Sequence, residues 1–503
     1  MIESSSEYLV LRWGIFFVAS AILIGIGYLV QMRLRRAKAG EAGFLLGGNE
    51  MGAFVAAGTL MATGYSGWGF IGSPGTAYAY GTIEVLGNFF FAPAITFGAL
   101  FFANFMRRHG EKYGALTVPE YLANTHRGPD ALRRVVHFAA AVATFTFLSV
   151  YIIGQIRAVG LVASSWLGIT VEISAILFMI VVIIFTMQGG LLAVAITDTL
   201  MCCGMVAGSI IVYYYVIQDI SLTDLIAKVN EMKVDGMLSG AERINPSTSI
   251  PYGEPKYSVF LVFVYALLFT TVLPYMSVRF LAFKKNLKVS LMALYMAPMG
   301  FFMSLIPIVG IYVYYKNPNL EKADMAMPYF LSNYIPPILG GLISLVIMFA
   351  MLSTISSVLQ VLASSLSHDM FVAVANKESK YADTLNRGAV VVTGILGIVL
   401  TFFAPDAMLN RIAYIGTGGL IAMLVGPTLM RTIVDANLMT CFLSMLTGFC
   451  LEVYLAFSVY TGDDGWVMAP IMAGLAGCVV YLIVGYVTNG MKCIPEGREV
   501  TAD

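Results

Sequence analysis

The apolar segment FAMLSTISSVLQVLASSLSHDM at residues 349–370 contains seven serine and threonine residues. Ser353 and Thr354 are adjacent, so on an α-helix they project about 100° apart and can border one gap between helices. Ala350, one turn earlier, can offer its carbonyl oxygen beside them. Such uncharged oxygens suit a weakly held Na⁺, whereas a carboxylate cage of the Ca²⁺ type binds too tightly for quick release. The alternative is structural, because a hydroxyl in a membrane helix usually bonds the carbonyl one turn back.

Two other segments contain residues that interrupt helices. MATGYSGWGFIGSPG at 61–75 has five glycines and a proline, and LLFTTVLPYMS at 267–277 has adjacent threonines before Pro274. Backbone that breaks inside a membrane must be satisfied by protein, water or a ligand. The first break would offer carbonyls of Ala62 and Tyr65 to an ion. Glycine and proline are also common in unbroken membrane helices, but two breaks in matching positions favour a transporter with its site near the bilayer midplane.

Arg157 is the one basic residue that we place well inside an apolar run. A charge at a membrane-helix centre costs at least ~2.5 kcal/mol, so an arginine there is a functional candidate. If it faces a central cavity, it would pair with a substrate carboxylate. Alternatively it extends toward the outer interface, which Trp166 marks.

The elements that position these residues must be membrane helices. The chain has 503 residues, of which 59% are hydrophobic and 12% charged, and its mean hydropathy is +0.82. Soluble domains carry about 25% charged residues, and a soluble protein could not hide this much apolar surface. We therefore predict an all-α polytopic membrane protein. The net charge of zero gives no reason to expect nucleic acid as a partner.

Apolar runs of about 20 residues predict about 13 transmembrane helices. They lie near 9–31, 50–80, 82–105, 135–166, 169–188, 190–217, 257–281, 289–315, 336–371, 388–404, 408–430, 437–460 and 466–488. An outside N-terminus and a cytoplasmic C-terminus put most of the 29 Lys and Arg residues inside, as the positive-inside rule requires. The six cysteines form no CxxC pair and the four histidines have no metal or triad spacing, so neither a metal site nor an enzyme is predicted.

Four motifs resemble the solute:sodium symporter family, which includes proline, pantothenate and acetate/monocarboxylate permeases. They are GYSGWGFIGSPGTAYAYG (64–81), GGLLAVAITD (189–198), PYMSVRFLAFKK (274–285) and AMLSTISSVLQVLASSLSHDMF (350–371). The resemblance covers nearly the whole chain and implies a LeuT-type core of two inverted five-helix repeats, each with one broken helix. Residues 1–49 would form an extra helix and a cytoplasmic linker. The remainder would form the first repeat (50–217), an extracellular loop (218–256), the second repeat (257–432), and two further helices with a short cytoplasmic tail (433–503).

The resemblance also implies a function and an ion site. The chain would be a cell-membrane symporter that imports a small organic solute with Na⁺ by alternating access, with no organic cofactor. The implied Na⁺ ligands are the backbone oxygens of Ala62, Tyr65 and Ala350 and the hydroxyls of Ser353 and Thr354. Asp198 matches a family aspartate on the inner side of that site, which is thought to help the ion leave. By position alone, Asp198 could instead be a solvated residue at a helix end.

For the solute we predict a carboxylate of the monocarboxylate or pantothenate type. Proline carriers of the family have an aspartate where this chain has Gly64, and sugar carriers have amides where it has Gly64 and Gly69. YIIGQIRAVG (151–160) is similar to the monocarboxylate branch, and GSPGTAYAYG to the pantothenate and proline branches. A proline-type symporter and a transporter-like sensor remain alternatives, and the oligomeric state is open. The predicted substrate-binding residues are Ser66, Gly67, Asn88, Gln155, Arg157, Thr270, Thr271 and Tyr275.

Overall fold

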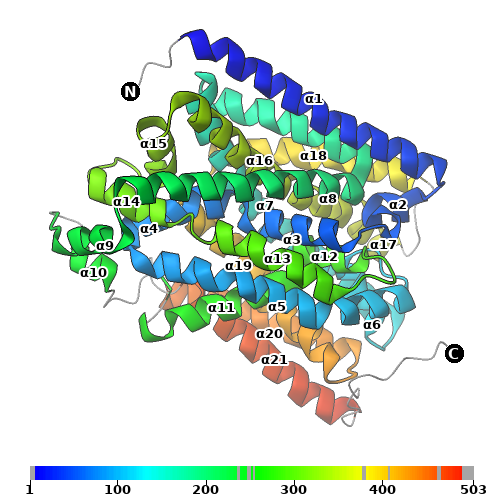
Figure 1. Ribbon diagram of the computed structural model, residues 1–503. Coiled ribbons are helices and arrows are strands. Elements are labelled where there is room, and N and C mark those ends of the chain that lie inside the picture. Colours follow the sequence, from blue (N-terminus) through cyan, green and yellow to red (C-terminus); the bar gives the residue numbers. More distant parts are fainter. Residues whose placement is uncertain are drawn as a thin grey trace.

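The structure is a computed structural model that describes residues 6–234, 238–245, 251–252, 255–375, 381–405, 408–460 and 466–489. Figure 1 shows long helices lying side by side in one bundle, with α1 along one flank and α20 and α21 on the other. The first half contains α1 (Ser6–Arg36), α2 (Gly40–Leu46), η1 (Gly47–Asn49), α3 (Ala53–Gly67), η2 (Trp68–Gly72), α4 (Ser73–Tyr80), α5 (Thr82–Tyr113), α6 (Val118–Thr125), α7 (Asp130–Leu167), α8 (Val171–Asp219), α9 (Leu222–Glu231) and α10 (Gly240–Ile244).

The second half is also helical within the described ranges. It contains α11 (Pro255–Val272), α12 (Pro274–Leu281), α13 (Val289–Met303), α14 (Ile308–Lys316), η3 (Ala323–Met325), α15 (Ala326–Asn333), α16 (Pro337–Ser364), η4 (Ser365–Asp369), α17 (Met370–Ala375), α18 (Ala382–Phe403), α19 (Leu409–Leu429), η5 (Met430–Thr432), α20 (Leu438–Tyr454), η6 (Leu455–Val459) and α21 (Met468–Asn489). Large apolar side chains on the outside, such as Phe101 at 76% exposure, fit a surface that faces lipid.

The expected count of 13 spans is not confirmed. Among the described residues, 10 helices are long and apolar enough to cross a membrane, or up to 11 if the bent pair α11–α12 counts as one. Helical segments cover all the predicted runs, but the run at 50–80 is divided into α3, η2 and α4, and the runs at 169–188 and 190–217 join in the 49-residue α8. A straight helix of that length would measure roughly 74 Å, far more than a bilayer core. Gly190, with φ 56 and ψ −152, interrupts its helical geometry.

Both predicted interruptions are present. Ser66, the second-last residue of α3, departs from helical geometry with φ 3 and ψ −160, just before the wide turn η2. The second lies between α11 and α12, whose axes differ by 52°. There Leu273 is extended, the conformation that a following proline imposes on its neighbour.

Small residues bring α3 against its neighbours. A Cβ added at Gly58 would lie 2.9 Å from Thr199 Cα, so glycine is what lets α3 approach α8 this closely. The next residue, Thr59, therefore reaches the Asp198 carboxylate, with 2.6 Å between Oγ1 and Oδ2. This packing positions the polar residues of the site.

A buried polar network joins four helical elements near α2. His368 of η4 contacts Glu41 of α2 at 2.9 Å and Glu120 of α6 at 3.4 Å, while Asn386 of α18 donates to Glu41 at 3.0 Å. Burial is the largest single influence and opposes ionisation of Glu120, but the hydrogen bond and charge of His368 together with the backbone N–H of Leu116 outweigh it, so the pKa of that carboxyl is lowered. These contacts hold α2, α6, η4 and α18 together near the basic segment 33–38.

Candidate functional site

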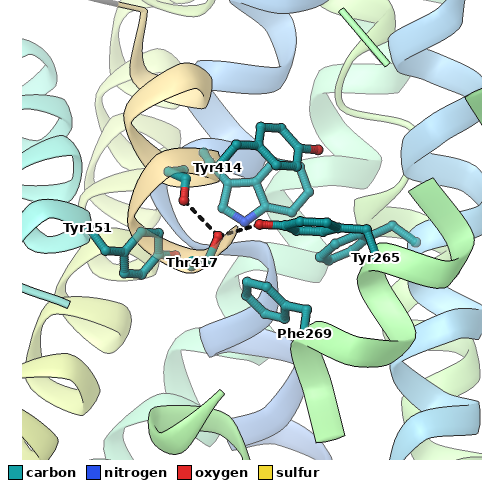
Figure 2. Close-up of a pocket in the computed structure, with 8 residues that line it drawn as sticks. Tyr151, Tyr265, Phe269, Tyr414 and Thr417 are labelled. Carbon is teal, nitrogen blue, oxygen red and sulfur yellow. Dashed lines mark hydrogen bonds between the residues drawn. The ribbon is translucent and has the colours of Figure 1, made fainter. Parts of the chain in front are cut away.

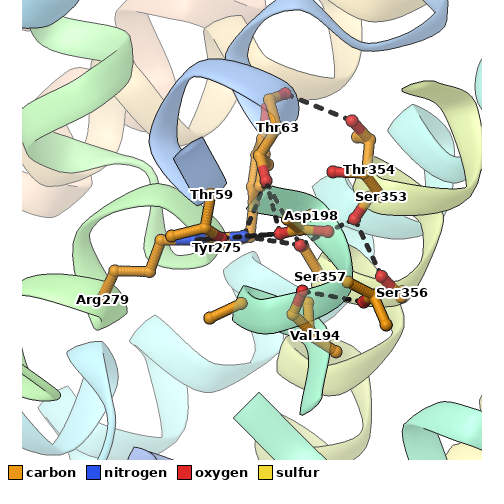
Figure 3. Close-up of polar contacts among 12 residues, drawn as sticks. Thr59, Thr63, Val194, Asp198, Tyr275, Arg279, Ser353, Thr354, Ser356 and Ser357 are labelled. Atoms are coloured by element: carbon orange, nitrogen blue, oxygen red, sulfur yellow. Dashed lines mark hydrogen bonds and ion pairs between the residues drawn. The ribbon is translucent and has the colours of Figure 1, made fainter. Parts of the chain in front are cut away.

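The structure brings the two predicted halves of the ion site together. Ala62 and Tyr65 lie in the last turn of α3 before its break, and Ala350, Ser353 and Thr354 lie on α16; all five are fully buried. The Thr354 hydroxyl donates to the carbonyl of Thr63 at 3.2 Å, which fixes α16 against this last turn (Figure 3).

The last turn of a helix leaves up to four carbonyls without helical partners. Here Thr354 satisfies the carbonyl of Thr63, and the indole of Trp68 donates to that of Gly64 at 3.0 Å. Ala62 and Tyr65, whose carbonyls are the predicted ligands, belong to the same turn. A cation is a suitable partner for such oxygens.

Asp198 lies directly beside this turn. Its Oδ2 accepts hydrogen bonds from Thr59 at 2.6 Å and Thr63 at 3.2 Å, and the residue has 0% exposure. The alternative of a solvated helix end is therefore excluded. Asp198 Oδ1 and the Ser353 hydroxyl are both buried and lie near each other, and neither makes a hydrogen bond of ordinary length within the described ranges. Buried unpartnered oxygens are costly, so both are available to a cation.

Sequence reasoning missed Arg279. Its guanidinium is fully buried and lies 3.1 Å from Asp198 Oδ2. Arg279 is therefore a second arginine that lies within a predicted run. The nearby lysines Lys284, Lys285 and Lys288 give this part of the sequence the composition of a basic loop. The place of Arg279 within the predicted run 257–281, five residues after Pro274, was the available signal.

An aromatic pocket lies beside the break in α3 (Figure 2). Its cavity is about 10 Å³, no more than one water needs, so a solute can enter only if side chains move. The Tyr265 and Thr417 hydroxyls are 2.6 Å apart, and Thr417 also donates to the Ala413 carbonyl. The pocket is lined by Trp68, Phe91, Tyr151, Tyr265, Phe269, Ala413, Tyr414 and Thr417.

Four of the predicted substrate-binding residues lie at or next to this pocket. The hydroxyls of Ser66 and Tyr151 are 3.3 Å apart, and the backbone N–H of Gly67 donates to Gln155 Oε1 at 2.9 Å. The ring of Tyr275 stacks on that of Tyr151, with centroids 5.4 Å apart. Ser66, Gly67, Gln155 and Tyr275 thus form one cluster around the first break.

The other four donate their hydrogen bonds elsewhere, although Asn88 Oδ1 is buried without a partner in the part of the chain that the structure describes. The Asn88 amide donates to Glu84 Oε1 at 2.7 Å and Ser73 Oγ at 2.9 Å. Thr270 and Thr271 donate to carbonyls of their own helix, at 3.1 and 2.9 Å, as hydroxyls in membrane helices commonly do.

Arg157 is not in the central pocket. Its guanidinium donates to the carbonyls of Ala404 and, at 2.6 Å, Pro405, just beyond the C-terminus of α18. Carbonyls at a helix C-terminus attract cations, which explains this position. Arg157 instead lines a separate cavity of about 660 Å³ with Lys322, Asp324 and several apolar side chains.

Asp324 connects η3 to the start of α19 and lies against α4. Its Oδ2 accepts from the backbone N–H of Leu409 at the start of α19, at 3.1 Å. A Cβ on Gly75 of α4 would lie 2.6 Å from Asp324 Oδ1. Burial raises the pKa of this carboxyl to about 6.

Comparison with known proteins identifies the family. Residues 44–448 match the model of the sodium:solute symporter family. The chain belongs to this family. It is 25% identical over 423 residues to sodium/proline symporter 2 of Staphylococcus saprophyticus, covering 80% of this chain and 78% of that protein. It is 27% identical over 398 residues to the sodium/pantothenate symporter of Haemophilus influenzae, covering 75% and 76%.

The fold agrees with this assignment. The structure of a Na⁺-coupled sialic acid symporter in a substrate-bound outward-open state superposes with a TM-score of 0.73 and 16% identity, covering 96% of this chain and 99% of that one. The predicted all-α, LeuT-type fold is confirmed. The symporter is a multi-pass membrane transporter that couples a small solute to Na⁺, and it is not an enzyme.

Proposed function

We propose that this symporter imports a small organic carboxylate without a compensating amine, of the monocarboxylate or pantothenate type. The observation that carries this proposal is the Gly67 N–H at the start of the second half of the broken helix, which donates to Gln155 Oε1. A carboxylate oxygen of the solute can replace that amide oxygen. The new bond would be charge-assisted and therefore stronger.

Helix dipoles support an anion at this place. One half-helix begins after Ser66 and another at Pro274, and the N-terminal end of a helix carries a partial positive charge. In transporters with broken helices, such ends commonly face the anionic group of the substrate. Tyr275, in the first turn of α12, stacks on Tyr151 of the pocket, so the second half-helix also begins close to it.

The lining of the pocket disfavours an amine. None of its eight lining residues, all within the described ranges, carries a charge. Gly64 also has no side chain that could pair with an ammonium group of the solute. Aromatic rings suit an apolar body, and the Tyr265–Thr417 and Ser66–Tyr151 pairs offer hydroxyls. Proline-type transport is the second candidate, because the curated relatives include sodium/proline symporters.

For the ion, we propose Na⁺ ligation by the backbone oxygens of Ala62, Tyr65 and Ala350 and the hydroxyls of Ser353 and Thr354, with Asp198 on the exit route. Their burial and proximity support this set. We further propose an outside N-terminus, a cytoplasmic C-terminus and location in the cell membrane, from the distribution of basic residues.

The test uses purified symporter in proteoliposomes with a radiolabelled panel: pantothenate, acetate, pyruvate and proline. We expect Na⁺-dependent uptake of a carboxylate in preference to proline. Gln155→Glu puts a negative charge beside the Gly67 N–H and should lower carboxylate uptake at least tenfold. Arg157→Gln, away from the pocket, should change it less than about twofold. Preferential uptake of proline, or a Gln155→Glu variant with normal carboxylate uptake, would overturn the proposed solute class.

A further inference from the structure

Arg279 occupies the polar region next to the proposed Na⁺ ligands. Its Nε donates to the Thr59 hydroxyl at 2.7 Å. One terminal nitrogen donates to Thr63 at 2.7 Å, Asp198 at 3.1 Å and Ser357 at 2.6 Å, and the other donates to the Tyr275 carbonyl. Figure 3 shows the guanidinium reaching from α12 to the group formed by Thr59, Thr63 and Asp198.

We propose that Arg279 is a resident cation of the transport cycle, which neutralises Asp198 when Na⁺ has left and thereby favours release of the ion. Arg279 is in this sense a positioning residue for ion coupling. The inference rests on the proposed Na⁺ site. In that site the ligands strengthen Na⁺ binding, whereas Arg279 weakens it.

The first argument is the cost of a buried charge. A buried carboxylate without a counter-charge is strongly disfavoured, and Asp198 and Arg279 are both at 0% exposure. When Na⁺ leaves, the guanidinium at 3.1 Å keeps the empty site close to neutral. Without it, Asp198 would attract Na⁺ more strongly and the empty carrier would be disfavoured.

The second argument is that the guanidinium contacts residues on both sides of the ion site. Thr63 accepts from Arg279 through its hydroxyl, and its carbonyl accepts from Thr354. Ser357 accepts from Arg279 and donates to the backbone carbonyl of Ser353 at 2.8 Å. A bound Na⁺ and the Arg279 charge are therefore close enough to repel each other in a medium of low dielectric constant.

The third argument is chemical. The planar fork of arginine can direct several N–H bonds in fixed directions, whereas a lysine ammonium cannot reproduce that geometry. Three nitrogens of Arg279 are used at once. The side chain is thus held in place by neutral oxygens from Thr59, Thr63, Ser357 and the Tyr275 carbonyl, and it can remain there whether or not Na⁺ is bound.

The test measures binding of ²²Na⁺ to the purified full-length protein by scintillation proximity, which requires no knowledge of the solute. We expect Arg279→Gln to tighten Na⁺ binding by about tenfold or more, because a nearby positive charge is removed. Asp198→Asn should weaken it, and the Asp198→Asn, Arg279→Gln double variant should bind Na⁺ more tightly than Asp198→Asn alone. Arg279→Lys keeps the charge and should stay closer to wild type than Arg279→Gln.

Arg431→Gln is the matched control, because Arg431 is a buried arginine that bonds Thr125 and Asp435. Its Na⁺ affinity should equal that of wild type. Suppose that wild type binds ²²Na⁺. The resident-cation role is then overturned if Arg279→Gln weakens binding or leaves it unchanged, both in the wild-type protein and in the Asp198→Asn variant. If wild type binds no ²²Na⁺, or if Ser353→Ala with Thr354→Ala leaves binding unchanged, the proposed Na⁺ site itself fails.

Discussion

At the scale of single residues, the proposed ion site is a set of neutral oxygens beside one buried carboxylate. The adjacency of Ser353 and Thr354 predicts that both can border one gap between helices, and the family resemblance implies that the broken helix lies across this gap. Arg279 could not be found in this way, because its charge made it look like part of a basic loop. Its burial depends on partners from three other helices, and no local pattern in the sequence reports them.

Removing both hydroxyls tests the proposed ligands. Ser353→Ala with Thr354→Ala should raise the Na⁺ concentration for half-maximal uptake by roughly tenfold or more, because two lost oxygens cost a couple of kcal/mol by analogy with unsatisfied buried polar groups. Expression should stay nearly normal, since alanine is a good helix former. An unchanged Na⁺ dependence would show that the hydroxyls are structural.

Asp324 makes stability depend on pH. Its folded-state pKa is about 6, above the ordinary 3.8, so the folded protein binds this proton more tightly than the unfolded chain. Its contribution to stability therefore grows as pH falls through 6 toward 4 and is lost as pH rises through 6. Asp324→Asn mimics the protonated form. At pH 7.5 it should therefore melt at a higher temperature than wild type, and its free energy of unfolding should exceed that of wild type by at most about 3 kcal/mol.

The comparison of the two proteins at pH 5 is the control for this prediction. There the difference in melting temperature between Asp324→Asn and wild type should shrink, because most Asp324 carboxyls are already protonated in the folded state. A difference in melting temperature that is the same at pH 5 and pH 7.5 would contradict the raised pKa of Asp324.

At the scale of helices, both interruptions were predictable because glycine and proline mark them locally. The boundaries of α8 were not. Two apolar runs on either side of Gly190 look like separate spans, while the structure joins them through a single residue with φ 56. Similarly, Arg157 could not be placed from sequence, because its partners, the carbonyls of Ala404 and Pro405, lie about 250 residues away.

Gly190 should therefore be intolerant of substitution. A Cβ there would be held at a left-handed φ and would collide with the backbone carbonyl of Phe44 in α2. Gly190→Ala should cost about 2 kcal/mol or more, seen as a lower melting temperature in detergent. Gly25→Ala in α1, where a Cβ meets nothing within 4 Å, should be close to wild type; equal melting temperatures for the two variants would contradict the strained turn.

At the scale of the whole molecule, composition and four motifs predicted the class and the family, since a chain this apolar must cross a membrane repeatedly and the motifs follow the family's order. The solute could not be predicted as well. The pocket proposed to bind it is lined by residues from η2, α5, α7, α11 and α19 and is almost closed in this structure. The open pocket that admits the solute must differ from the one seen here.

The most direct test of the whole account is uptake of a radiolabelled carboxylate into proteoliposomes under an inward Na⁺ gradient. With one Na⁺ per monovalent carboxylate, a tenfold gradient should support about tenfold accumulation, and no charge would move across the membrane, so voltage would have no effect. Uptake should fall to background when choline replaces Na⁺, or when gramicidin collapses the gradient. Equal accumulation driven by a proton gradient in the absence of Na⁺ would contradict the account.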